Sequence, residues 1–128
     1  MPKHKKLLKV RIPPYSYPRN AWRKLINKIV AEKAEKAGIK FAKNDKLEVQ
    51  VKLYMEKALL KANDVDNRLK DILDAIQGRA GGSKTIHKLK AVVPNDNQIY
   101  RASIEKMAPS PQSHGLGHLI IKLYKKEK

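Results

Sequence analysis

The sequence predicts an α/β fold in which two helices pack against a small mixed β-sheet, with the elements in the order β-α-β-α-β-β. Two observations carry this prediction: residues 47–56 alternate strictly between apolar and polar, and two longer segments repeat apolar residues every three or four positions. The chain has 128 residues, and a chain of this size folds as one domain that buries about two-thirds of its extended surface. We therefore expect a single domain over residues 1–128.

The first half of the chain is expected to form a strand, a helix and a second strand. Residues 7–12, LLKVRI, alternate in polarity and are followed by two prolines, which cannot continue a ladder of hydrogen bonds. Residues 19–41 have helical spacing, which predicts an amphipathic helix of roughly four to five turns between a cap at Asn20 and a stop at Gly38. The alternation at 47–56 predicts the second strand.

The second half is expected to add a helix and two strands. The helix ends at Gly78, and its apolar stripe is formed by Leu69, Ile72, Leu73 and Ile76. The strands are expected near 99–107 and 118–124, on either side of a loop rich in proline, serine and glycine. Residues 79–93 contain no acidic residue, and we expect a flexible basic loop there. The alternative interpretation of this loop is a solvated insertion with no role.

The net charge of +17 limits the binding partners more strongly than it limits the fold. A field of this sign attracts polyanions, so nucleic acid is the leading candidate, and the alternative is a charge that serves solubility alone. No apolar run reaches the roughly 20 residues of a membrane span, and no membrane partner is expected. The absence of cysteine fits a cytoplasmic protein. The segment GRAGGSK lacks the spacing of a phosphate-binding loop, so no nucleotide cofactor is expected.

An acidic cluster interrupts this basic chain, because four of the twelve acidic residues lie within residues 64–74. Asp64 and Asp66 are expected at the entrance of the second helix, where a carboxylate caps free N–H groups and contributes roughly 0.5–2 kcal/mol. Asp66 is also spaced to pair with Lys70, and Asp74 extends the same row of the helix. These helix-stabilising roles are one interpretation of the cluster, and a cation-binding site is the other.

Asp96 favours the cation-binding interpretation. It lies in a turn just before a predicted strand, and if that strand lies beside the second helix, Asp96 can join Asp64 and Asp66 in one pocket. Three carboxylates are hard oxygen donors of the kind that Mg²⁺ and Mn²⁺ bind together with water and phosphate oxygen. The carboxylates would then hold the metal, and the basic surface would hold a polyanion.

Two segments resemble the signature of a known family. DVDNRLKDILDAIQG at residues 64–78, followed by NDNQI at 95–99, is similar to the motifs of the RusA family of Holliday-junction resolvases. The resemblance implies a RusA-like fold and a Mg²⁺-dependent endodeoxyribonuclease, with Mn²⁺ as a substitute. It also implies a homodimer that resolves four-way DNA junctions by paired nicks in recombination and repair. Asn95 departs from the family, which has an aspartate at that position.

Carried over position by position, the resemblance assigns the chemistry to four residues. It implies that Asp64, Asp66 and Asp96 bind metal and act in catalysis, and that Lys70 stabilises charge on the phosphate or positions the attacking water. It gives supporting roles to Asn67, Asp74 and Gln98. The DNA backbone is expected to contact basic residues of the loop and of the following strand, namely Arg79, Lys84, Lys88, Lys90 and Lys106.

Two other functions remain open from the sequence. One is a non-catalytic basic nucleic-acid-binding protein, in which the acidic residues only cap a helix. The other is a nuclease that acts on forks, flaps or other branched DNA. Incubation of a labelled junction with Mg²⁺ separates a nuclease from the binding protein, because only a nuclease produces nicks. A panel of branched DNA substrates separates the two nucleases.

Overall fold

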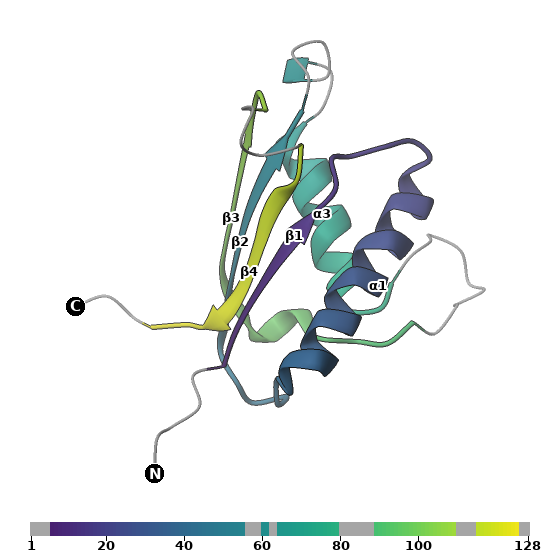
Figure 1. Cartoon of the computed structure of the whole chain (residues 1–128). Helices are drawn as coiled ribbons and strands as arrows, with labels where there is room; N and C mark the ends of the chain where they lie inside the picture. The colour runs from purple at the N-terminus through teal and green to yellow at the C-terminus, as the bar shows by residue number, and fades with distance from the viewer. Residues whose placement is uncertain (1–5, 56–59, 62–63, 80–88, 110–114, 126–128) are drawn as a thin grey trace.

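The computed structural model describes residues 6–55, 60–61, 64–79, 89–109 and 115–125. These residues form an α/β fold in the predicted order β-α-β-α-β-β (Figure 1). A short 3₁₀ turn, Asp96–Gln98, directly precedes the third strand. The strands and helices are β1 (Leu7–Ile12), α1 (Arg19–Ala37), β2 (Leu47–Tyr54), α3 (Val65–Ile76), β3 (Ile99–Met107) and β4 (Gly117–Leu123).

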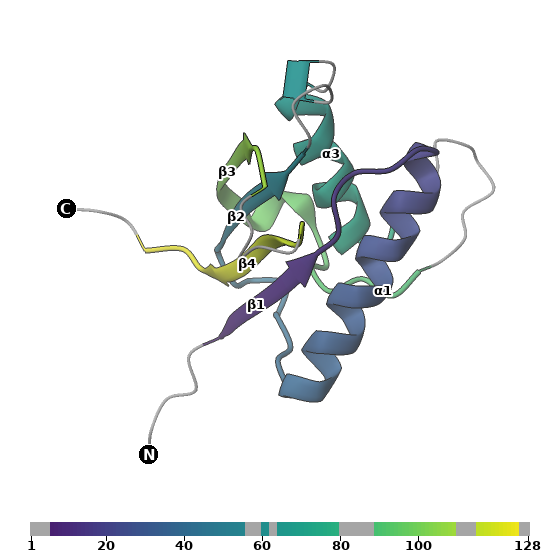
Figure 2. The ribbon, with the colours of Figure 1, turned by 45° about the horizontal axis from the view of Figure 1, so that its top comes forward.

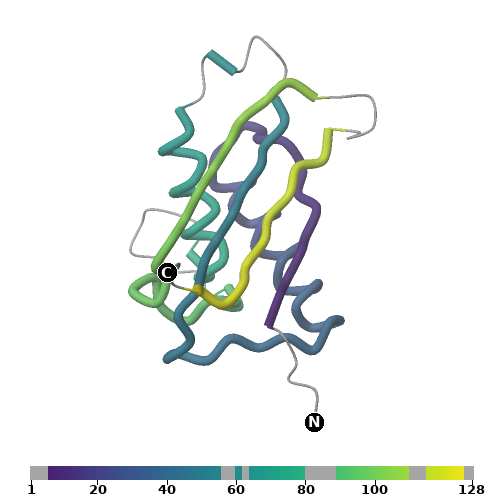
Figure 3. Tube along the Cα trace, turned by 90° about the vertical axis from the view of Figure 1, so that its left-hand side faces the viewer, coloured from purple at the N-terminus to yellow at the C-terminus, as the bar shows by residue number. Residues whose placement is uncertain are grey.

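The four strands form one mixed sheet in the order β1-β4-β2-β3 (Figure 3). β4 runs antiparallel to both β1 and β2, whereas β2 and β3 are parallel and are connected through α3. In their register Leu47 lies opposite Ile99 and Tyr54 lies opposite Met107. The parallel pairing therefore places the start of β3 at the same end of the sheet as the start of β2.

Both helices cover one face of the sheet, and no helix of the described residues covers the other face (Figure 2). β1 has the expected alternation, since Leu8, Val10 and Ile12 are buried on the helix side and its remaining residues are exposed. Trp22 of α1 is buried and packs edge-on against Tyr15. Within the described ranges, neither α1 nor α3 combines the length and apolar character that crossing a membrane requires.

The first helix begins one residue earlier than its predicted cap. Pro18 is the N-cap in an extended conformation, and Asn20 lies inside the first turn, so the prediction of Asn20 as the cap was wrong. Proline is tolerated at this position because the N–H of the N-cap takes no part in the hydrogen bonds of the helix, so the missing donor costs nothing there. The predicted stop is confirmed: Gly38 adopts a φ of +67° and donates its N–H to the carbonyl of Glu35.

The predicted flexible loop at 79–93 is wrong for its last part. Val92 and Val93 are buried, and both donate their N–H groups to the carbonyl of Ile76, at 2.8 and 2.9 Å. The side chain of Asn27 on α1 donates to the carbonyls of Ala75 and Lys90, each at 2.8 Å. Residues 89–93 are therefore fixed against both helices, because their backbone groups complete the end of α3. The rest of the loop, residues 80–88, lies outside the described residues.

Gly78→Ala should lower the free energy of unfolding by more than Gly38→Ala. Both glycines have positive φ, +82° and +67°, which costs a residue with a side chain about 1–2 kcal/mol. A Cβ on Gly78 would also lie 2.5 Å from the carbonyl oxygen of Leu89, whereas nothing lies within 4 Å of the same atom on Gly38. We expect an additional loss of about 1–3 kcal/mol for Gly78→Ala, measured by urea unfolding. Equal losses would show that residues 89–93 move away freely.

Candidate functional site

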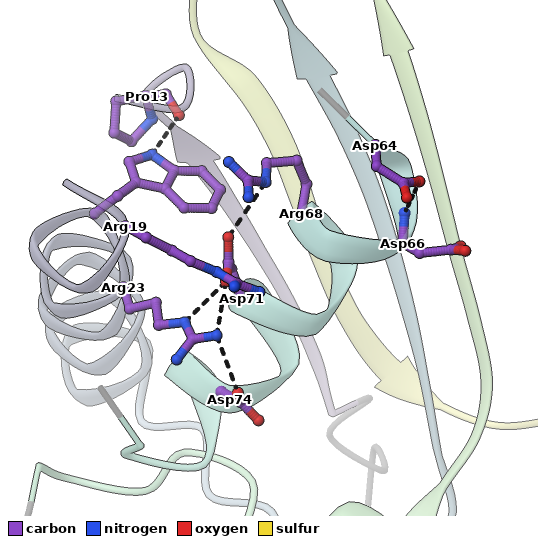
Figure 4. Close-up of polar contacts among 9 residues, drawn as sticks. Pro13, Arg19, Arg23, Asp64, Asp66, Arg68, Asp71 and Asp74 are labelled. Atoms are coloured by element: carbon purple, nitrogen blue, oxygen red, sulfur yellow. Dashed lines mark hydrogen bonds and ion pairs between the residues drawn. The ribbon is translucent and has the colours of Figure 1, made fainter. Parts of the chain in front are cut away.

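The inner half of the acidic cluster joins the two helices. Asp71 is fully buried and its carboxylate contacts three arginines, Arg19 and Arg23 of α1 and Arg68 of α3 (Figure 4). Nε of Arg23 donates to Oδ1 of Asp71 at 2.8 Å, and Nη2 of the same arginine lies 3.5 Å from Oδ2 of Asp74. The predicted supporting residue Asp74 therefore lies against α1, and both acidic residues have a structural role there.

Asp64 and Asp66 form the outer half of the cluster at the N-terminus of α3. Asp64 is the N-cap, and its Oδ1 accepts the backbone N–H of Asp66 at 3.1 Å. Asp64 therefore caps the helix, as the helix-stabilising interpretation of the cluster requires. Both side chains are exposed, and Figure 4 shows them pointing away from the arginines around Asp71. Neither carboxylate forms an ion pair with any described residue, although the chain contains 29 lysines and arginines.

Lys70 lies one turn beyond Asp66 on α3 and is exposed. No ion pair between Lys70 and Asp66 is present among the described residues, so the expected pair at this spacing does not form. Lys70 instead lines an open hollow together with Arg19, Arg23 and Arg79. Its amino group is therefore available to an anion in that hollow.

Figure 1 shows the start of β3 and the start of α3 at opposite ends of the sheet, and Asp96 directly precedes β3 whereas Asp64 and Asp66 stand at the start of α3. β3 does lie beside α3, as the prediction required, but β3 begins level with the start of β2, whereas Asp64 follows the end of β2. The two ends of this eight-residue strand are roughly 25 Å apart. The prediction that the three aspartates share one pocket within a chain was therefore wrong. Across the described ranges, no cluster of three or more His, Cys, Asp or Glu residues could hold a metal ion.

The turn that contains Asp96 is built by its neighbours. Asn95 caps the turn by accepting the N–H of Asn97, and the side chain of Gln98 accepts the N–H of Asn95 at 2.9 Å. Gln98 is buried and also donates to the carbonyls of Ala42 and Asp45. Asn95, where the family has an aspartate, thus acts as a cap, and Gln98 supports the backbone from which the exposed Asp96 projects. The other predicted supporting residue, Asn67, is exposed in the first turn of α3.

The predicted DNA-binding residues have different environments. Arg79 is exposed just after α3. Lys90 is also exposed, and its Nζ forms an ion pair with Oε2 of Glu35 at 3.7 Å. Lys106 lies on the helix side of β3 and donates to the carbonyl of Leu60, in the connection that leads to α3. Its amino group therefore fixes the backbone near the acidic pair. Lys84 and Lys88 lie outside the described residues.

Arg19 and Arg23 were not among the site residues that the sequence predicted. They are four residues apart on α1, which places them on one helix face, and this spacing was the available signal. Their role depends on α3, whose acidic residue Asp71 is 48 residues from Arg23 and 52 from Arg19 in the sequence. A local pattern does not reveal a contact over such a separation.

Comparison with known proteins assigns no family to the chain. No protein-family model matches it, and no curated protein matches it. A function must therefore be argued from the motif at 64–78 and from the geometry around Asp64, Asp66 and Lys70.

The acidic pair fits a divalent cation in part. Mg²⁺ is commonly bound through one or two carboxylates, with waters and substrate phosphate completing its shell. The carboxylate of Asp66 has no ion-pair partner among the described residues. Asp64 accepts the capping hydrogen bond through Oδ1, and its Oδ2 takes no part in that bond. The donor set is therefore adequate for one ion that is shared with a phosphate.

Proposed function

We propose that the protein is a Mg²⁺-dependent endonuclease that cuts branched DNA, with four-way Holliday junctions as its substrate in DNA recombination and repair. The observation that carries this proposal is the acidic pair Asp64 and Asp66, exposed and without ion pairs among the described residues of a chain with a net charge of +17. The chain is rich in lysine and arginine, so carboxylates that stay unpaired among its described residues are suited to bind a metal. Their place in the motif at 64–78 supports a nuclease.

Three residues have distinct roles in the proposed reaction. Asp64 and Asp66 hold Mg²⁺, or Mn²⁺ in its place, at the start of α3. The metal supplies Lewis-acid activation of the scissile phosphate and of the water that hydrolyses it. Lys70 contributes a positive charge that stabilises the additional negative charge on the phosphate as the phosphodiester bond breaks. The basic surface holds the DNA backbone without reading its sequence.

A homodimer would complete the site. Asp96 lies at the far end of the sheet from the acidic pair of its own chain, so a site that uses all three aspartates takes Asp96 from a second subunit. A two-fold axis that brings Asp96 of the first chain to the start of α3 of the second chain also brings Asp96 of the second chain to the start of α3 of the first. The dimer then has two identical sites. Two sites related in this way match the paired cuts that resolve a four-way junction.

The full chain should nick a labelled four-way junction in Mg²⁺ or Mn²⁺ and lose this activity in EDTA. Denaturing gels report the position of the nicks in each strand, and we expect symmetric nicks in two opposite strands. Forks, flaps and linear duplex in the same assay define the substrate class. A shift of the junction in native gels without any nick in either metal would favour the non-catalytic DNA-binding protein, in which Asp64 only caps α3.

A further inference from the structure

A basic hollow lies between the start of α1 and the second half of α3. Its volume is about 680 Å³, and among the described residues four basic side chains line it, those of Arg19, Arg23, Lys70 and Arg79. Asp74 is the acidic residue of the lining. We call this site the cationic hollow. It differs from the acidic pair, which lies at the N-terminus of α3 and is not part of its lining.

Positive charge exceeds negative charge around the hollow. Asp71 contacts the lining residue Arg23, and Arg68 contacts Asp71 in turn. Together with the lining, these two residues make five basic and two acidic side chains among the described residues. Three of these bases share the single carboxylate of Asp71. The excess positive charge lines a hollow of the surface, and a hollow lined mainly by one sign of charge attracts an anion.

The arginines keep hydrogen-bond donors available to an anion. Arg19 uses Nε for Asp71, and its two Nη groups donate no hydrogen bond to any described residue. Arg23 is 7% exposed and uses Nε and Nη2 for acidic partners, which leaves Nη1 without an acceptor in the described part of the chain. A buried guanidinium with unused donors is stabilised when an oxyanion accepts them, and phosphate matches its geometry.

The start of α1 adds backbone donors to the same place. The first turn contains no acidic residue, and its N-cap, Pro18, provides no side-chain hydrogen bond. Pro18 and Asn20 line the hollow, so the free N–H groups of this turn lie at its edge. The positive end of the helix dipole favours an anion at such a position.

We infer that the cationic hollow binds a phosphate group of the nucleic-acid backbone, next to the phosphate that is cut; the second part of this inference rests on the proposed function. Lys70 lies four residues beyond Asp66, which corresponds to about 6 Å along the helix axis. Successive phosphates of one DNA strand advance about 3.4 Å along the duplex axis. The edge of the hollow at Lys70 is therefore within roughly two phosphate steps of Asp66 along the helix axis, and a phosphate bound there would position the strand relative to Asp64 and Asp66.

Arg79→Ala tests the inference, with Lys24→Ala as the matched control. Arg79 is exposed and forms no ion pair with any described residue, and Lys24 is an exposed cation on α1 outside the hollow. Junction affinity is measured in EDTA over a range of salt concentrations, so that no cleavage is needed. The association constant K for the junction falls as salt rises, and the loss of one phosphate contact in Arg79→Ala should make the slope of log K against log salt less steep by about 0.9. The slope should not change for Lys24→Ala.

A titration of the wild-type chain with inorganic phosphate locates the anion directly. The side-chain Nε–H signals of Arg19 and Arg23 should shift saturably in NMR spectra, and chloride at equal ionic strength should not reproduce the shift. Equal slopes for the two variants, or an effect of phosphate that chloride reproduces, would overturn the inference. A wild-type chain that never nicks DNA would reject the proposed nuclease. If that chain still binds phosphate saturably, and Arg79→Ala still lowers the salt dependence of junction binding, the anion site in the hollow is retained. The two proposals therefore fail separately.

Discussion

Mixing the Asp66→Asn and Asp96→Asn variants should restore junction nicking that neither variant shows alone. Asp66 stands at the start of α3, and Asp96 stands at the other end of the sheet. If each site combines Asp66 of one subunit with Asp96 of the other, a mixed dimer has one site with both substitutions and one site with neither. The intact site nicks one strand, and each homodimer carries one substitution in both of its sites.

The extent of the recovery is set by subunit exchange. Random exchange makes about half of the dimers mixed, and one of their two sites is intact, so roughly a quarter of the wild-type nicking should return. The products should be single nicks, because the second cut needs a second intact site. Both variants are refolded together after mixing, and the nicks are counted on a denaturing gel with a junction labelled in each strand in turn.

A chain that carries both substitutions is the control for the mixing experiment. Combined with Asp66→Asn it leaves no intact site in any dimer, so nicking should stay absent. Asp66→Asn by itself should bind the junction at least as tightly as the wild type, since it removes a negative charge that faces DNA phosphate. No recovery on mixing, with an active wild type, would mean that each site lies within one chain or does not use Asp96.

The elements of the fold could be predicted because their signals are local. Alternation at 7–12 and 47–56 needs only the neighbouring residues to indicate a strand, and the structure has β1 and β2 there. Pairing is different, because it depends on contacts between distant segments. The residues of β2 and β3 do not indicate that these two strands pair in parallel. This pairing places Asp96 at the far end of the sheet from Asp64.

At the candidate site, too, the local sequence pattern could not predict which aspartates of the acidic cluster are buried and which are exposed. Asp64 was predicted as a helix cap from its position alone, and it is one. Asp71 has the same side chain and lies seven residues further on the same helix, but it is buried because α1 packs against that face. The sequence pattern could place both residues on α3, and the packing of the two helices decided which carboxylates remain exposed.

Asp71→Asn should destabilise the protein strongly while leaving the shape of the side chain unchanged. Asp71 has no exposed surface, and its carboxylate contacts Arg19, Arg23 and Arg68, of which the last two are 7% exposed. A neutral amide removes the counter-charge that Asp71 provides to the largely buried Arg23 and Arg68, and Asp74 at 3.5 Å from Arg23 replaces it only in part. Removal of one partner from a buried ion pair typically costs about 3–5 kcal/mol, and we expect a loss of this size in urea unfolding at neutral pH.

Asp74→Asn separates the effect of burial from the effect of charge. Its carboxylate is 21% exposed, and within the described part of the chain it contacts one arginine, Arg23, at 3.5 Å. Water can replace that contact, so the expected loss is about 1 kcal/mol or less. A loss of several kcal/mol is a large part of the roughly 5–15 kcal/mol that holds a domain folded, so Asp71→Asn should be studied at low temperature. Equal losses for the two variants would mean that the three arginines around Asp71 reach water or another anion when its charge is removed.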